Sequence, residues 1–322
     1  MPEPRGRMRD AALAALAPAV WGSTYLVTTE LLPPGRPLLA ATLRALPSGL
    51  LLVAVTRALP RGRWLWRAAC LGLLNIGAFF ALLFVAAYRL PGGIAALVGS
   101  VQPLLVLILA ALLLRERTRG RDVAACVLGA AGVALLVSAS TGGLDPVGVA
   151  AALGAAGCMA LGIVLTKRWS RPVGLLAFTG WQLTAGGLFL LPLTALVEGL
   201  PGRITAGNAL GYGYLCVIGA LFAYAVWFRG VERLPAVAVS LLGLLSPVVA
   251  ALLGLVVLGQ TLAPPQLLGA AAVLMGIALP QLPVRHRAPA DDTTRGKETD
   301  EHRHRNVPGS RPEGRRPGLP AS

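Results

Sequence analysis

The sequence predicts an all-α polytopic membrane protein with ten transmembrane helices, arranged as two inverted five-helix repeats. Of its 322 residues, 55% are hydrophobic and 13% are charged, and the mean hydropathy is +0.69. That composition is too apolar for a soluble protein of this length. The other two observations behind the prediction are a series of apolar windows of membrane-spanning length and an internal repeat.

Ten windows have the length that a membrane span requires. A helix needs about 20 apolar residues to cross a hydrocarbon core about 30 Å thick, because its backbone groups must be paired within the segment. The windows are continuously apolar instead of alternating at every second residue, so we expect helices and not barrel strands. They cover approximately residues 11–32, 38–56, 68–88, 93–114, 122–140, 147–166, 174–197, 209–228, 236–258 and 266–282.

The first window follows a basic start, residues 1–10, and this arrangement also occurs in signal peptides. Here the apolar run continues through Val27 to Leu32, which is longer than the apolar part of a signal. We therefore expect the window to be retained as the first helix.

Basic residues are concentrated in alternate connections between the windows, which predicts the orientation of the chain. The net charge is +15, from 29 basic and 14 acidic residues. One set of connections holds Arg57, Arg61, Arg63, Arg67, Arg115, Arg117, Arg119, Arg121, Lys167, Arg168, Arg171, Arg229 and Arg233. The other set holds only Arg36, Arg89 and Arg203, with Asp145 and Glu198. Because basic loops stay in the cytoplasm, we expect a multi-pass protein of the plasma (inner) membrane with both termini cytoplasmic, and no nucleic-acid partner.

The last 40 residues differ in composition from the rest of the chain. Residues 283–322 are rich in Arg, Pro, Gly, Asp and Glu and have almost no apolar side chains, which predicts a disordered cytoplasmic tail. All three histidines, His286, His302 and His304, fall in this tail. The four cysteines lie inside windows at unrelated spacings and are interpreted as small packing residues. We expect no bound metal and no cofactor.

The two halves of the apolar region repeat one another. Residues 89–135 align without a gap on residues 233–279, at a constant shift of 144. An RLP sequence opens both segments, and Pro103 matches Pro247. Upstream, LLAATLRALPSG at 38–49 resembles LLAFTGWQLTAG at 175–186. These matches predict two copies of one unit.

The copies are expected at residues 11–140 and 147–282, with five helices each. Five is an odd number, so the second copy must enter the membrane from the opposite side, as in many secondary transporters. Pro103 and Pro247 fall near the middle of the fourth and ninth windows. Each proline removes a backbone hydrogen bond, so we expect kinked helices with free carbonyl groups near the midplane.

Arg44 lies well inside the second window, where an arginine costs about 2.5–3.5 kcal/mol at helix-centre depth. Two interpretations remain open. The side chain could extend to the outer headgroups or pair with a helix C-terminus. Alternatively, it faces a water-filled cavity and offers its fork of donors to a carboxylate or other anionic group of a solute.

Other candidate solute-binding residues form a sparse polar and aromatic set within the windows, for which simple packing is the competing interpretation. The set comprises Trp21, Ser23, Thr24, Tyr25, Asn75, Gln102, Trp181, Gln182 and Tyr224. Aromatic residues near span ends usually form interface belts, to which we assign Trp64, Trp66, Trp169 and Trp227.

Glu30 is the carboxylate placed inside a window. Burial would raise its pKa and suit it to carry a coupling proton. The alternative is a position at the outer edge, in water near Arg36.

Several of these sequences together resemble the EamA family within the drug/metabolite transporter superfamily, over roughly residues 11–282. They are WGSTY at 21–25, LPPG at 32–35, Arg44, the RLP starts, the mid-helix prolines, Glu116 and Thr118 as E-x-T, and Gly132-Val133. The resemblance implies two five-helix repeats, cytoplasmic termini and a central solute cavity, and it favours the cavity interpretation of Arg44. Many members of the family move amino acids or other small metabolites outward. Gln260 in LGQTL at 258–262 departs from the acidic residue usual there, which weakens any role given to Glu116 by symmetry.

These observations predict a secondary transporter of small metabolites, working by alternating access without ATP, because the sequence has no Walker motif. Export of amino acids or related compounds is the favoured activity. A lipid-acting membrane enzyme would need a nucleophile with a base, or a metal set, at membrane depth. A sensor or scaffold without transport would be expected to carry a folded cytoplasmic domain.

The expected partners are a small solute and the lipid bilayer. The small residues Ala125, Gly129, Ala272 and Gly276 allow close helix approach, either within one chain or in a homodimer.

Overall fold

The computed structural model describes residues 4–90, 92–136, 138, 145–199, 203–259 and 263–281. Within these ranges the chain forms helices joined by short connections, and no strand is present. The expected tail at 283–322, with its three histidines, and Gln260 lie outside the described residues.

Seven helical segments are long and apolar enough to cross a membrane by length and composition. They lie in α1 (Pro4–Leu31), α2 (Pro37–Thr56), α3–η1–α4 (Arg63–Gly72, Leu73–Gly77, Ala78–Arg89), α8 (Pro146–Arg168), α9 (Leu175–Val197), α10–η3–α11 (Ala206–Cys216, Val217–Phe222, Ala223–Arg233) and α12–α13 (Ala236–Leu242, Leu245–Leu258). The remaining elements are shorter: α5 (Gly92–Gly99), α6 (Gln102–Leu109), η2 (Ala110–Leu114), α7 (Gly120–Leu136), α14 (Pro264–Ala278) and η4 (Leu279–Gln281).

Helices α2 and α9 pack antiparallel along their length. The start of α2 meets the end of α9, where the Glu198 carboxylate accepts hydrogen bonds from the backbone N–H groups of Leu38 and Leu39 at 2.6 and 2.7 Å. Midway along, Gly49 lies so close to Thr184 that no side chain fits between the two backbones. Glycine thus permits the close contact, and a carboxylate satisfies otherwise unpaired N–H groups at a helix start.

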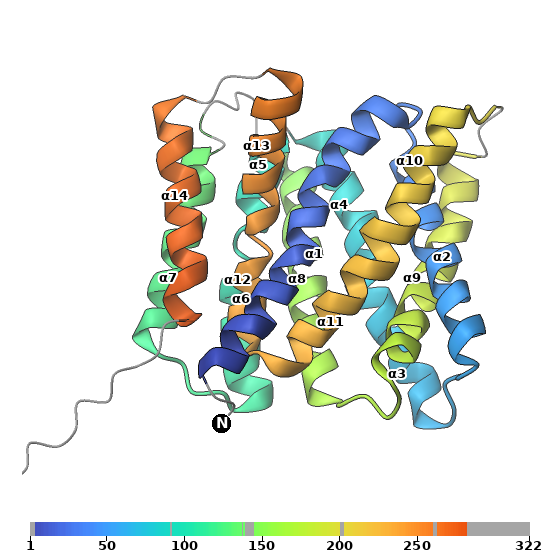
Figure 1. The fold of residues 1–322 in the computed structure, drawn as a ribbon, viewed down its shortest axis with the longest axis horizontal. Helices are drawn as coiled ribbons and strands as arrows, with labels where there is room; N and C mark the ends of the chain where they lie inside the picture. Colours follow the sequence, from blue (N-terminus) through green and yellow to red (C-terminus); the bar gives the residue numbers. More distant parts are fainter. Residues whose placement is uncertain are drawn as a thin grey trace, which may run out of the picture. The chain divides into compact units, whose positions relative to one another are not determined.

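Helices α7 and α14 form a second antiparallel pair, seen at one edge of the bundle in Figure 1. Gly132 faces the backbone of Gly269 and Val273, and Gly276 faces Ala125 and Gly129. Of the small residues expected to allow close helix approach, Ala125, Gly129 and Gly276 therefore pack against one another within one chain. They let the two backbones approach closely, as small residues do between membrane helices.

The chain start and several basic connections lie at one end of the bundle, which we call the N-terminal face (lower edge in Figure 1). Asp10 of α1 is 3.1 Å from Arg229 and 3.7 Å from Arg233 at the end of α11. Arg168, at the end of α8, donates to the carbonyl oxygen of Leu113 in η2 at 2.9 Å. The residues between α1 and α2 and the starts of α8 and α10 lie at the other end, the opposite face.

Two helical segments are interrupted at positions 143 residues apart, within one residue of the repeat shift of 144. Helix α5 ends at Gly99 and α6 begins at Gln102, while α12 ends at Leu242 and α13 begins at Leu245. Pro103 and Pro247 therefore lie in the first turn of a new helix, where a missing N–H is tolerated. The π-helical turns η1 and η3 start 144 residues apart, at Leu73 and Val217.

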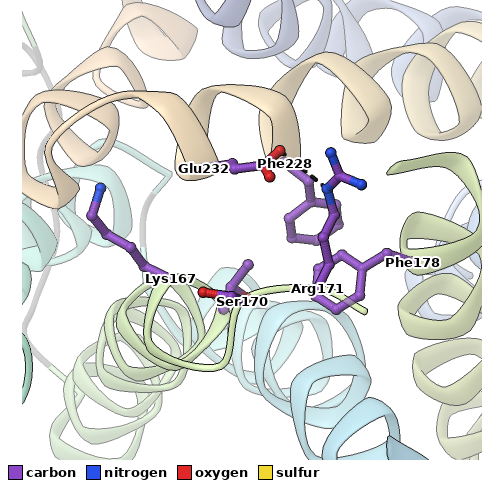
Figure 2. Close-up of a pocket in the computed structure, with 7 residues that line it drawn as sticks. Lys167, Ser170, Arg171, Phe178, Phe228 and Glu232 are labelled. Atoms are coloured by element: carbon purple, nitrogen blue, oxygen red, sulfur yellow. Dashed lines mark hydrogen bonds and ion pairs between the residues drawn. The ribbon is translucent and has the colours of Figure 1, made fainter. Parts of the chain in front are cut away.

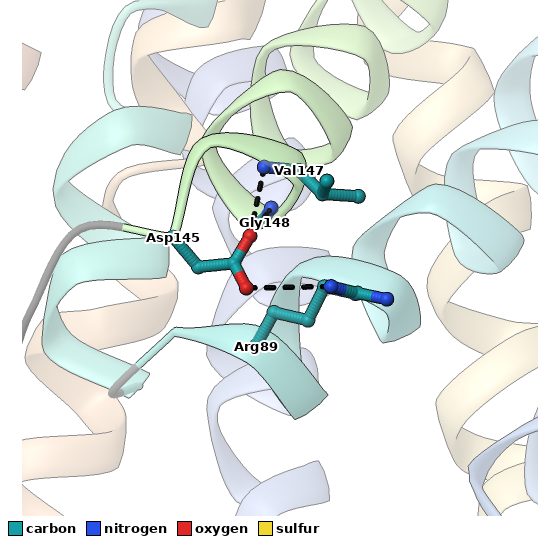
Figure 3. A network of polar contacts seen from close by, with 4 residues as sticks. All are labelled: Arg89, Asp145, Val147 and Gly148. Atoms are coloured by element: carbon teal, nitrogen blue, oxygen red, sulfur yellow. Dashed lines mark hydrogen bonds and ion pairs between the residues drawn. The ribbon is translucent and has the colours of Figure 1, made fainter.

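Asp145 caps the start of α8 at the opposite face (Figure 3). Its Oδ1 accepts from the N–H groups of Val147 and Gly148 at 2.8 and 3.0 Å, and its Oδ2 lies 3.3 Å from Arg89. The hydrogen bond from Gly148, aided by those from Val147 and Arg89, holds the pKa of this carboxyl below its usual range. The ionised form therefore stabilises the fold.

This cap predicts a pH-dependent stability difference between the wild-type protein and Asp145→Ala. Because the pKa is lowered by folding, the contribution of Asp145 is complete above its unfolded pKa and is lost as the pH falls through the folded value. The gap in melting temperature should be constant from neutral pH to about pH 5 and should shrink in more acidic buffer. Thermal unfolding in detergent measures it. A gap of the same size at every pH would contradict the cap.

Candidate functional site

Arg44 of α2 turns inward and contacts the second half of the chain. Its side chain is only 7% exposed, and Nη2 donates to the carbonyl oxygen of Gly219 in η3 at 3.0 Å. The guanidinium carbon lies 5.2 Å from the ring centre of Phe80 and 5.8 Å from that of Tyr224. Arg44 makes no ion pair with any described carboxylate, and its Nε has no hydrogen-bond partner there. A buried cation thus retains donor capacity for an anionic group.

Trp21 of α1 shares the acceptor of Arg44. Its indole Nε1 donates to the same Gly219 oxygen at 3.1 Å. The ring centre of Trp21 lies 5.2 Å from Tyr224 and 5.1 Å from Trp227. We call Arg44, Trp21, Gly219, Tyr224 and Phe80 the arginine cluster. It joins α1, α2 and α4 to the η3–α11 segment, and the two cation–π contacts of Arg44 partly replace the water around its guanidinium.

Asn75 and Gln182 form a second polar group with Thr166, which we call the amide cluster. Asn75 Nδ2 donates to Gln182 Oε1 at 2.7 Å and lies 3.2 Å from Thr166 Oγ1. All three side chains are buried, at 1%, 0% and 7% exposure. Asn75 Oδ1 and Gln182 Nε2 have no hydrogen-bond partner among the described residues. Buried polar atoms without partners are costly, so this cluster also has capacity for a solute or water.

The remaining candidates belong to neither cluster. Trp181 donates to the carbonyl oxygen of Ala58 at 2.7 Å, next to the connection between α2 and α3. Gln102 begins α6 and is half-buried, and Glu30 is exposed near the end of α1. Thr24 has a buried hydroxyl without a partner in the described part of the chain, whereas the side chain of Tyr25 lies outside that part. Ser23 lies 2.6 Å from the hydroxyl of Tyr214.

One aromatic assignment from the sequence is wrong. Trp227 was expected in an interface belt, but it is 2% exposed and packs against Trp21. The sequence window ended at residue 228, but α11 continues to Arg233, so Trp227 lies inside the helical segment and packs into the bundle. Among the described residues, no group of three His, Cys, Asp or Glu side chains is arranged to hold a metal ion.

Comparison with known proteins matches both halves of the chain to one family. The model of the EamA-like transporter family matches residues 9–138 and again residues 146–280. Protein PecM of Dickeya dadantii (strain 3937) is 50% identical over 270 residues, which cover 83% of this chain and 91% of that protein. The chain belongs to the EamA-like transporter family.

Other EamA relatives cover nearly the same span. The inner membrane transporter YedA of Escherichia coli (strain K12) is 31% identical over 81% of this chain and 86% of its own length. The probable amino-acid metabolite efflux pump of Salmonella typhimurium is 29% identical over 84% of this chain and 93% of its own. A solved crystal structure shares the fold with a TM-score of 0.74 and 22% identity, covering 85% of this chain and 96% of that one. The protein is therefore a multi-pass EamA membrane transporter.

Sequence reasoning missed two residues of this EamA-family site, Phe80 and Gly219. Phe80 is one of many apolar residues in its window, and Gly219 contributes only a backbone oxygen. Gly219 lies in a π-helical turn, and such turns are frequent at functional sites. The π-helical turn η1 lies outside the aligned segment 89–135, and π-turns have no simple residue pattern, so neither turn could be expected from the sequence.

Proposed function

We propose that this EamA-family protein is a secondary transporter that exports small metabolites, amino acids or related compounds among them, by alternating access. Its ten spans are built as two inverted five-helix repeats. The N-terminal face lies in the cytoplasm in this arrangement, because the basic connections gather at that face and basic loops are retained in the cytoplasm.

Several observations support the inverted repeats. One family model matches the chain twice. The π-helical turns start 144 residues apart, and the helix interruptions recur 143 residues apart, within one residue of the repeat shift. Helix α2 packs antiparallel to α9, which carries the matching sequence, and α7 packs antiparallel to α14. Two copies of opposite orientation can exchange conformations and expose a shared site to each side in turn.

The observation that carries the transport proposal is the buried Arg44, which has no carboxylate partner among the described residues and contacts both repeats. A charge inside a membrane segment is costly and is usually functional. Its free donors suit the anionic group of a solute, and the rings of Trp21, Phe80 and Tyr224 suit an apolar body.

Reconstitution in liposomes tests this function. Labelled amino acids and related metabolites are screened for flux with and without a pH gradient, using protein-free liposomes as the control. We expect saturable flux of at least one compound without ATP. If every compound moves only as fast as in protein-free liposomes, transport of this class is contradicted, and a sensor or a lipid-acting enzyme becomes the better account.

A further inference from the structure

A small pocket opens at the N-terminal face between the end of α8, the start of α9 and the end of α11 (Figure 2). Its volume is about 80 Å³. Lys167, Ser170 and Arg171 line one side, and Phe228 and Glu232 of α11 reach in from the other, with Phe178 beside them. Thr166 completes the lining, so the pocket combines two cations, one carboxylate, two hydroxyl groups and two aromatic rings.

An ion pair crosses the mouth of this pocket. Arg171 Nε lies 3.1 Å from Glu232 Oε2, and the two side chains are 30% and 44% exposed. Arg171 also donates from Nη1 to the carbonyl oxygen of Val173 at 2.6 Å, which fixes its position. Lys167 is held separately, by the carbonyl oxygen of Leu234 and by Glu116 at 3.7 Å. An ion pair this exposed is weak, because water screens both charges.

The pocket borders both inner clusters. Along α11, Glu232, Phe228 and Tyr224 are spaced four residues apart and share one face of the helix. The ring centres of Tyr224 and Phe228 are 5.8 Å apart, and Tyr224 also contacts Arg44. On the other side, the pocket residue Thr166 belongs to the amide cluster with Asn75. A solute leaving the pocket inward would meet one cluster or the other.

We infer that this pocket is a loading vestibule for zwitterionic solutes, which carry a carboxylate and an ammonium group a few bonds apart, as α-amino acids do. The solute carboxylate takes the place of Glu232 on Arg171, while its ammonium group binds Glu232. This inference rests on the proposed function, for which it names the solute class and the loading site.

Charge balance explains why a zwitterion is favoured. A purely anionic solute that binds Arg171 leaves Glu232 without its partner, and a cation that binds Glu232 leaves Arg171 alone. A zwitterion satisfies both groups at once and so separates the ion pair without leaving a charge uncompensated. Separating the pair removes one polar contact between the end of α11 and the turn after α8, while the hydrogen bond from Lys167 to Leu234 remains.

A labelling experiment tests the vestibule without requiring transport. Ser170→Cys, in nanodiscs, is reacted with a membrane-impermeant maleimide, and the wild-type protein gives the background from its four native cysteines. The probes are L-alanine, L-serine, L-leucine and L-phenylalanine, compared with their amides, which are cations, and their N-acetyl forms, which are anions. We expect at least one free amino acid to slow labelling at concentrations about tenfold lower than either derivative requires.

Two charge variants in the Ser170→Cys background assign the roles. Glu232→Gln should abolish the preference for the free amino acid over its N-acetyl form. Arg171→Gln should abolish the preference for the free amino acid over its amide. Arg168→Gln is the matched control, because Arg168 bonds to Leu113 outside the pocket and should leave both preferences intact.

The inference is overturned if no free amino acid slows labelling, if the derivatives protect equally well, or if both charge variants keep the wild-type selectivity. Flux in liposomes without this protection would refute the vestibule and leave the transport proposal standing. Selective protection without any flux would refute transport and leave the binding site.

Discussion

Arg44→Gln is expected to reduce saturable solute flux by about tenfold or more, because it removes the charge-assisted donors of the arginine cluster. A hydrogen bond to a charged group contributes about 1.5–3 kcal/mol, which corresponds to a factor of roughly 10 to 100 in binding. Glutamine is also too short to keep the contact with Gly219 while reaching a solute. Initial rates in liposomes, measured over a range of solute concentrations, give both the half-saturation value and the maximal rate.

Two matched variants separate charge from geometry. Arg44→Lys keeps the positive charge but loses the planar fork, so we expect partial flux. Arg61→Gln removes an exposed arginine from the connection between α2 and α3 and should transport at the wild-type rate. Wild-type transport of every solute by Arg44→Gln, in protein that elutes as a single folded species, would refute the assignment of Arg44.

Gly49→Val should have the largest effect on stability. A side chain at residue 49 would meet the backbone nitrogen of Thr184, and its Cβ would lie 2.6 Å from the Thr184 hydroxyl oxygen. Backbone atoms cannot move aside as a flexible side chain does, so α2 and α9 must separate. Overpacking of this kind costs about 1–3 kcal/mol. Because α2 carries Arg44, we expect a lower melting temperature in detergent together with reduced transport.

Gly157→Ala supplies the control for this effect. Gly157 lies inside α8 with no heavy atom within 4 Å of an added Cβ. Alanine favours helices over glycine by about 1 kcal/mol, so this variant should be as stable as the wild type or more so. If Gly49→Val melts at the same temperature as Gly157→Ala, the close contact between α2 and α9 is incorrect.

Much of the secondary structure follows from the sequence because a membrane imposes a simple rule on length and polarity. The second window, 38–56, matches α2, which spans Pro37–Thr56. The ninth window, 236–258, begins at the start of α12 and ends at the end of α13. The fifth was less accurate, since the window extends to residue 140 and α7 ends at Leu136. Small and weakly polar residues near that end give no sharp boundary.

The site was only partly predictable from the sequence. The position of a residue within an apolar window indicates how deep it lies in the membrane, but not which neighbouring helix its side chain faces. Arg44, Trp21 and Tyr224 were candidates, and the fold brings them together. Trp181 belonged to the same set and lies elsewhere, at the carbonyl of Ala58. The carbonyl of Gly219, which receives both Arg44 and Trp21, has no signature in the sequence.

The pairing of α7 with α14 makes the folding of each half of the chain depend on the other half. Each of the two family matches, 9–138 and 146–280, contributes one member of that pair. A fragment ending before residue 145 would contain α7 without α14, so the glycine-containing face of α7 would be exposed to lipid. In the complementary fragment, the matching face of α14 would be exposed. Neither piece is self-sufficient, so a severed chain should regain its structure only when both pieces are made in the same membrane.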